Sequence, residues 1–167
     1  MLSKRTIVNL LLLAIVISLT MYINRNPVED NEVFEITKLT SDQVDTVVIQ
    51  RADHTQIIFE KIDNNWLITN PVEGKANPEK FNLLLKFLNL KSRHQHRITD
   101  QKQLLRYELE NPKVSLFLND QQFDFGNTND FNKLRYIFHE GIVHSVKDIT
   151  HHLLIADAES FLAESTE

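Results

Sequence analysis

The longest apolar run of the chain extends from Thr6 to Ile23 and contains no charged residue. Eleven of its eighteen residues are Leu, Ile or Val, and each of these favours insertion into a bilayer by about 0.3 to 0.6 kcal/mol. Eighteen residues in a helix extend for about 27 Å, close to the roughly 30 Å of a hydrocarbon core. The pattern predicts a transmembrane helix over residues 6–23.

A cleaved signal peptide is the alternative to a permanent anchor. The apolar part of a signal peptide usually has about 7–15 residues and ends in small side chains, whereas this run is longer and ends in Thr-Met-Tyr-Ile-Asn at 20–24. We therefore expect residues 1–23 to be a cytoplasmic end and an uncleaved anchor. Lys4 and Arg5 outweigh Arg25 across the helix, which predicts a cytoplasmic N-terminus and an extracytoplasmic C-terminal domain.

The segment 24–31 is polar, contains a proline and is expected to be a linker. Beyond it, apolar side chains recur at every second position in three short stretches, which is the period of a half-buried strand. These positions are Val47 and Ile49, Ile57 and Phe59, and Trp66 and Ile68. Asp53-His54 and Asp63-Asn64-Asn65 separate the stretches, and Asn and Asp suit tight turns. The pattern predicts a three-stranded antiparallel meander with Trp66 in its core.

A helix is expected next, over residues 78–90. Asn77 can cap its first turn, and Pro78 suits the first helical position because its missing N–H costs nothing there. Its apolar side chains fall on two opposite faces. One face carries Phe81, Leu84, Leu85 and Leu88, and the other carries Leu83, Phe87 and Leu90. The second face is either covered by the rest of the domain or is a docking surface for another protein, and both interpretations stay open.

Two hairpins are expected in the second part of the chain. Residues 113–118 and 121–125 flank Asn119-Asp120, and residues 134–139 and 142–146 flank Glu140-Gly141; both dipeptides suit two-residue turns. Short helices are expected to end near Leu154 and Leu162. The pattern predicts one α+β domain over residues 32–163, followed by a tail at 164–167. Strands followed by a helix occur twice, which favours two related halves, 32–91 and 104–163.

Composition excludes several classes of function. The chain has no cysteine, so thiolate metal sites, thiol redox chemistry and disulfides are absent. Its three glycines stand far apart, which excludes the glycine-rich loops that cradle phosphates. The net charge of −5 would repel a phosphate backbone. We expect no nucleic-acid partner and no cofactor.

Four stretches resemble one bacterial envelope family. They are Lys61–Pro71 around Trp66, Tyr107–Pro112, Phe125-Gly126 followed by Arg135-Tyr136-Ile137, and Gly141–Val146. Their order is similar to that of the family known as domain of unknown function 4340, and the similarity covers most of residues 33–163. The chain departs from the family pattern at Glu108, where the family usually has glycine, and this puts the tight backbone turn there in doubt.

The resemblance implies a protein of the bacterial inner membrane with one membrane helix and a periplasmic domain. Members of the family are sometimes associated with ABC-type export machinery. The resemblance implies no catalytic residue, because none is established for the family.

The segment 91–97 is the one locally basic patch in an otherwise acidic domain. Its candidate contact residues are Lys91, Arg93, His94, His96 and Arg97. We expect a solvated basic loop, which could also meet lipid headgroups or an acidic partner. His94 and His96 could face the same way, but the two arginines beside them oppose a cation. No metal site is therefore expected.

Nothing in the sequence indicates an enzyme. The serines lack a nucleophile-elbow context, and the acidic pair Glu108 and Glu110 comes without a third catalytic group. The first hypothesis is a membrane-anchored, non-enzymatic accessory subunit that acts by protein contact in an envelope complex, with Leu83, Phe87 and Leu90 as candidate docking residues. The alternative is an extracytoplasmic module that senses a ligand or contacts lipid.

Overall fold

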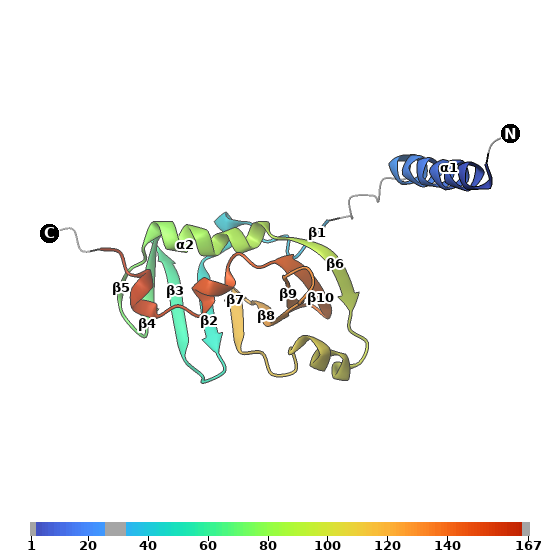
Figure 1. The fold of residues 1–167 in the computed structure, drawn as a ribbon. Helices are drawn as coiled ribbons and strands as arrows, with labels where there is room; N and C mark the ends of the chain where they lie inside the picture. Colours follow the sequence, from blue (N-terminus) through green and yellow to red (C-terminus); the bar gives the residue numbers. More distant parts are fainter. Residues whose placement is uncertain (1–2, 26–32, 165–167) are drawn as a thin grey trace. The chain divides into compact units, whose positions relative to one another are not determined.

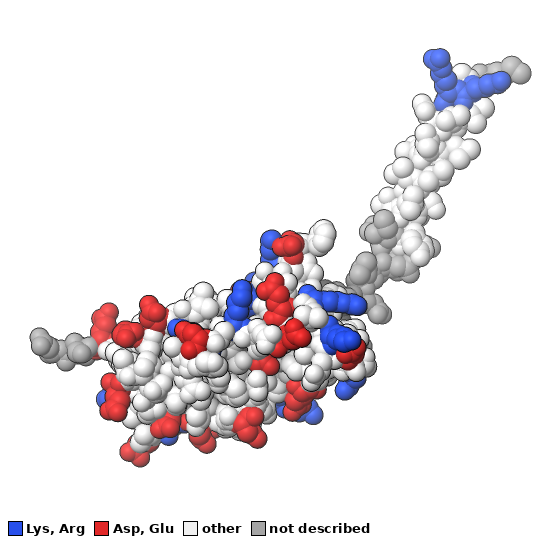
Figure 2. Space-filling view, turned by 90° about the horizontal axis from the view of Figure 1, so that it is seen from below, with Lys and Arg blue, Asp and Glu red and all other residues white. Residues whose placement is uncertain are grey.

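The computed structural model describes residues 3–25 and 33–164, which belong to two separate units divided between Glu32 and Val33. The first unit contains one helix, α1 (Lys4–Arg25), and its window Lys4–Tyr22 is long and apolar enough to cross a membrane. Figure 2 shows α1 as a rod without charged side chains along its described apolar length and with the basic side chains of its first turn, Lys4 and Arg5, at one end. Most of the expected linker, residues 26–31, and most of the expected tail lie outside the described residues.

The second unit is an α+β domain built on one antiparallel sheet of ten strands, as the sequence predicts at the level of fold class (Figure 1). The strand order is β1-β6-β10-β9-β8-β7-β2-β3-β4-β5. The strands are β1 (Phe34–Glu35), β2 (Thr46–Arg51), β3 (Gln56–Ile62), β4 (Asn65–Asn70), β5 (Gly74–Lys75), β6 (Lys91–Arg97), β7 (Val114–Leu118), β8 (Gln121–Thr128), β9 (Leu134–His139) and β10 (Ile142–Lys147). The helices are α2 (Pro78–Leu85) and α3 (His151–Leu154), with 3-10 turns η1 (Ser41–Gln43), η2 (Lys86–Asn89), η3 (Gln101–Tyr107) and η4 (Ala158–Phe161).

The predicted turns occur where the sequence places them. Asn64, Asn119 and Glu140 have positive φ angles of 63°, 54° and 46°, and Gly141 follows Glu140 with a φ of 78°. Asn tolerates this left-handed backbone better than most residues, and glycine adopts it freely. The meander β2–β3–β4 and the hairpins β7–β8 and β9–β10 are therefore confirmed.

Pairing between β2 and β7 joins the two parts of the chain at the centre of the sheet. Val47 lies opposite Leu118, and Ile49 lies opposite Leu116. All four side chains are buried, so this junction is part of the core. Strands β2 to β5 lie on one side of it and β7 to β10 on the other. That the two halves are related to each other stays a prediction.

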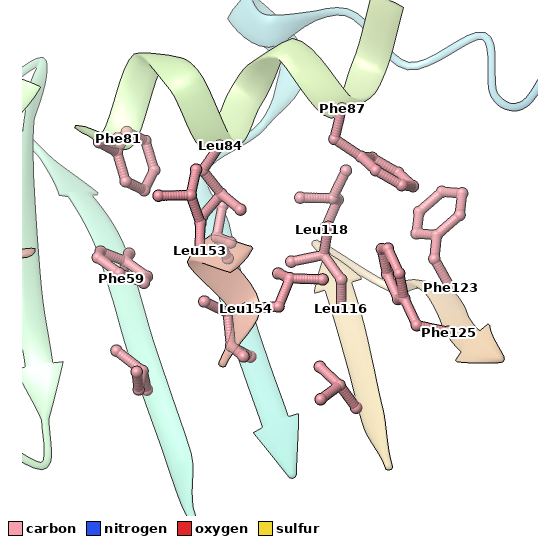
Figure 3. Close-up of a cluster of buried hydrophobic side chains, with 14 of the residues drawn as sticks. Phe59, Phe81, Leu84, Phe87, Leu116, Leu118, Phe123, Phe125, Leu153 and Leu154 are labelled. Carbon is pink, nitrogen blue, oxygen red and sulfur yellow. The ribbon is translucent and has the colours of Figure 1, made fainter. Parts of the chain in front are cut away.

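One face of the sheet carries the main core, beneath α2 and η2 (Figure 3). The side chain of Asn77 accepts hydrogen bonds from the backbone N–H groups of Glu79 and Lys80 at 3.0 and 3.2 Å, as expected for the cap of α2. Phe81 and Leu84 point from α2 into this core. The half-buried ring of Trp66 lies 4.4 Å from the ring of Phe81, so Trp66 packs at the margin of the core.

The second apolar face of the helix lies largely in the same core. Phe87 is 0% exposed, and its ring lies 4.9 Å from that of Phe123 and 5.7 Å from that of Phe125. Leu90 is 7% exposed, and the partly buried Leu83 packs against the core. Of the two interpretations left open for this face, coverage by the rest of the domain is therefore the one that fits Phe87 and Leu90. The reason is that the helix changes to 3-10 geometry at η2 and the sheet extends far enough to cover its second face.

The segment after β6 covers the opposite face of strands β8 to β10. Leu109, Leu134 and Val143 are buried but do not belong to the main core cluster. A Cβ atom at Gly126 would lie 2.1 Å from the carbonyl oxygen of Tyr107, so only glycine allows this close approach. Glu108 has a φ of 54° and ends η3 in the left-handed region. The tight turn is thus present although glycine is not.

Candidate functional site

The basic segment 91–97 forms a strand, β6, so the prediction of a loop there is wrong. It pairs antiparallel with β10, from Arg97 opposite Ile142 to Ser92 opposite Val146. Because the segment has no apolar residue, pairing with a strand far along the sequence stabilises it, rather than local propensity. A bulge interrupts the pairing between Ser145 and Val146, where the hydroxyl of the buried Ser92 accepts a hydrogen bond from the N–H of Ser145 at 3.2 Å.

The outer edge of β6 is largely open. The two-residue strand β1 pairs only with Lys91 and Ser92, and none of the described strands pairs with this edge between Arg93 and Arg97. The N–H of Ile98 donates to the carbonyl of Gly141 at 2.8 Å, on the β10 side. Backbone groups alternate in direction along an antiparallel strand. The N–H and C=O groups of Gln95 and Arg97 therefore point away from β10, towards the open edge.

The other end of the sheet is covered by the chain itself. The N–H of Ala163 donates to the carbonyl of Lys75 in β5 at 2.9 Å. Ala76, which follows β5, forms an isolated antiparallel bridge with Leu162. The two ends of the sheet thus differ, and β6 is the end that offers backbone hydrogen-bonding groups over several residues.

A hollow of about 230 Å³, here called the tyrosine hollow, borders β6 on one face of the sheet. It is lined by His94, Gln95, His96, Tyr107, Asn129, Asn132, Tyr136, Val143 and Ser145. The rings of Tyr107 and Tyr136 meet edge to face at 4.7 Å, and the amide of Asn129 donates to the hydroxyl of Tyr136 at 2.9 Å. The ring of His96 lies 6.2 Å from that of Tyr107. The walls of this hollow are aromatic and hydrogen-bonding.

A second hollow of about 400 Å³, here called the histidine hollow, borders the strand on the side of Gln95. It is lined by Glu35, Ile36, Thr37, Lys38, Gln95, Gln121, His139, Glu140, Ile142 and His144. The ring of His139 stacks on Phe123 at 4.1 Å, and its Nδ1 makes a 2.8 Å hydrogen bond with the carbonyl of Gln122. The ring of His139 is therefore fixed in position.

His144 is buried beside this hollow, with 2% of its surface exposed. Its Nδ1 atom has no hydrogen-bond partner among the described residues. Burial, and secondarily the nearby His139, lowers the pKa of His144 to about 4 from the usual 6.5. The imidazole is thus neutral at pH 7 and can take part in hydrogen bonding without carrying charge.

Acidification is expected to destabilise the domain through His144. The unfolded chain takes up a proton near pH 6.5 and the folded chain only near pH 4, so the free energy of unfolding falls across this window. The shift corresponds to a loss of about 3 kcal/mol. Urea unfolding between pH 7 and pH 4.5 should show this loss for the wild type and a much flatter profile for His144→Leu. His152→Gln, at an exposed histidine, is the matched control; an equal slope in all three proteins would contradict the assignment to His144.

The structure gathers His94 and His96 at the tyrosine hollow, together with two tyrosines that the sequence analysis did not single out. His139 and His144 were likewise not predicted from the sequence to lie at a site. Their positions in the period-two patterns of β9 and β10, in step with Ile137 and Val146, are the signal that could have placed them on the inner face. Within residues 3–25 and 33–164, no group of three His, Asp or Glu side chains is arranged to hold a metal ion.

Two further observations concern charged and titratable groups. Lys91 and Glu35 form an exposed ion pair at 2.8 Å, and burial lowers the pKa of the half-buried His151.

In a comparison with known proteins, the chain matches no family model, no curated protein and no solved structure. The similarity to the domain of unknown function 4340 family therefore stays a prediction.

Proposed function

We propose that the protein is a membrane-anchored, non-enzymatic interaction subunit of a bacterial envelope complex. The observation that carries this proposal is the open edge of β6, with basic side chains along it and a hollow on each side. Such an edge presents backbone N–H and C=O groups in fixed directions, and an extended segment of a partner protein can pair with them. A link to an ABC-type exporter, which the family resemblance implies, is the finer form of the same proposal.

The anchor helix supports the proposal on physical grounds. A domain held at a membrane meets other membrane proteins at a far higher effective concentration than a free domain does. A weak contact at the β6 edge can therefore be sufficient in the membrane. Of the two contact surfaces considered from the sequence, the basic segment with Arg93, His94, His96 and Arg97 is the exposed one. Phe87 and Leu90 of the other surface are buried, and Leu83 is partly buried.

Photo-crosslinking in intact membranes tests the function. A benzophenone side chain at Arg93, on β6, should yield one major adduct with a membrane protein, identified by mass spectrometry. The same side chain at Glu73, an exposed position near the covered end of the sheet, should yield none. Equal labelling from both positions, or no protein adduct from Arg93, would contradict the proposal. Binding of the protein to anionic vesicles through Arg93 and Arg97 would then support the lipid-contacting alternative.

A further inference from the structure

We propose that the partner of this domain contributes an extended, acidic segment that adds to the sheet as a strand beside β6. The inference rests on the proposed function and specifies the class of partner and its mode of binding. It follows from three properties of the β6 edge: backbone groups that no described strand pairs with, the hollows on its two faces and its charge.

The backbone at Gln95 and Arg97 is arranged for strand addition. Their N–H and C=O groups point to the open edge, and both side chains are exposed. Strand β1 shows how a chain uses this edge, since Phe34 and Glu35 pair with Ser92 and Lys91. An added strand would pair with β6 beyond Phe34, the residue at which β1 begins. Pairing of this kind supplies affinity through main-chain hydrogen bonds.

The two hollows lie where the side chains of an added strand would reach. His94 and His96 lie opposite Ser145 and Val143, and all four border the tyrosine hollow. Gln95 lies opposite His144, and both border the histidine hollow. Side chains of a strand alternate between the two faces of the sheet. Successive residues of an added strand would therefore contact the two hollows in turn, which provides selectivity for sequence.

The charge of β6 selects an acidic partner. The strand carries Lys, Arg and His residues and no Asp or Glu. The strand already seated on this edge shows the same complementarity, because Glu35 of β1 forms its ion pair with Lys91. Basic residues and a bulge also protect an edge against pairing with its own kind. A second copy of β6 would place like charges side by side, so a partner protein is favoured over a dimer.

Peptide binding to the full-length protein in nanodiscs tests the inference. The probes are two fluorescent octapeptides, Thr-Glu-Val-Glu-Val-Glu-Val-Thr and the same sequence with Lys in place of Glu. Fluorescence anisotropy should give at least a tenfold lower Kd for the acidic peptide. Methylating alternate backbone nitrogens of the acidic peptide should weaken binding at least tenfold, because it removes the N–H groups that pair with β6. Equal binding of the methylated and unmethylated peptides would overturn strand addition.

Variants of the protein locate the binding site. Gln95→Pro removes an N–H that points to the open edge and leaves the hydrogen bonds to β10 in place, so it should abolish peptide binding while the thermal unfolding curve is retained. The double variant Arg93→Glu, Arg97→Glu should also lose binding of the acidic peptide while its thermal unfolding curve is retained. It should bind the lysine peptide with a lower Kd than the acidic peptide. Lys86→Glu with Lys102→Glu, at exposed lysines outside β6, changes the net charge equally and should leave binding unchanged. Equal losses in both charge variants would show a general charge effect and overturn the site.

Two other occupants of the edge are outcomes of the same test. Glu29, Asp30 and Glu32 precede β1 in the sequence. If only the variant Glu29→Gln, Asp30→Asn, Glu32→Gln bound the acidic peptide, the edge would be assigned to the chain's own residues. A concentration-dependent dimer that dissociates in the Gln95→Pro variant would assign the edge to a second copy of the chain. A partner crosslinked from position 93 that persists when Gln95→Pro is added would leave the proposed function intact and overturn strand addition. The absence of any partner in the wild type would overturn the proposed function.

Discussion

Replacing Phe87 with alanine is expected to lower the free energy of unfolding by about 3–5 kcal/mol. The side chain is fully buried between η2 and the sheet, in ring contact with Phe123 and Phe125 (Figure 3). Its removal leaves a cavity between η2 and β8 that rigid strands cannot close. Urea unfolding followed by the fluorescence of Trp66, the one tryptophan, measures the effect. Phe87→Glu should not fold at all, because it places an unpaired charge in the core.

Phe131→Ala is the matched control for this substitution. Phe131 is 99% exposed, so the same chemical change there should alter stability by less than about 0.5 kcal/mol. If Phe87→Ala were as stable as the wild type but lost its membrane partner, the helix face would be a docking surface after all. The unfolding measurement therefore separates a core role from a contact role.

Replacing Leu12 and Val16 with arginine is expected to release the protein from membranes. Each arginine near the centre of a membrane helix costs about 2.5–3.5 kcal/mol, and together they cancel the roughly 3–6 kcal/mol that the apolar residues of the helix supply. Both side chains are exposed in the helix and lie one turn apart on the same face. Alkaline extraction of membranes followed by immunoblotting should find the wild type in the pellet and the double variant in the supernatant.

Leu12→Ala with Val16→Ala is the control and should remain in the pellet, because alanine keeps the helix uncharged. Retention of the double variant Leu12→Arg, Val16→Arg in the pellet would mean that another part of the chain holds it at the membrane. N-terminal sequencing of the wild type from the pellet decides between an anchor and a signal peptide. A sequence that begins at Met1 supports the anchor, and one that begins after Ile23 would show cleavage.

The turns and the helix start could be predicted from the sequence because their causes are local. Asn119 and the Glu140-Gly141 pair adopt left-handed backbone angles, and Asn77 accepts hydrogen bonds from the first turn of α2. These preferences belong to the residues themselves and survive in any fold. The antiparallel strands on either side of each turn then follow from the period-two pattern.

The basic residues of the candidate site could be predicted from the sequence, but their arrangement in an open edge strand could not, because it depends on contacts between distant residues. β6 has no apolar alternation, and it is a strand because β10, about fifty residues later, pairs with it. Burial of Phe87 likewise depends on β8, which follows the helix by more than thirty residues. The open edge becomes visible only when the order of all ten strands is known.

The junction between β2 and β7 has a consequence for the order in which the domain can be made. A chain that emerges from its N-terminal end completes β2 to β5 and α2 long before Val114–Leu118 is available. During that time β2, with the sequence Thr-Val-Val-Ile-Gln-Arg, has one edge without its native neighbour. Stretches rich in β-branched residues are prone to pair with other chains when exposed. The interval between synthesis of the two halves is therefore the time at which this protein is most vulnerable to aggregation.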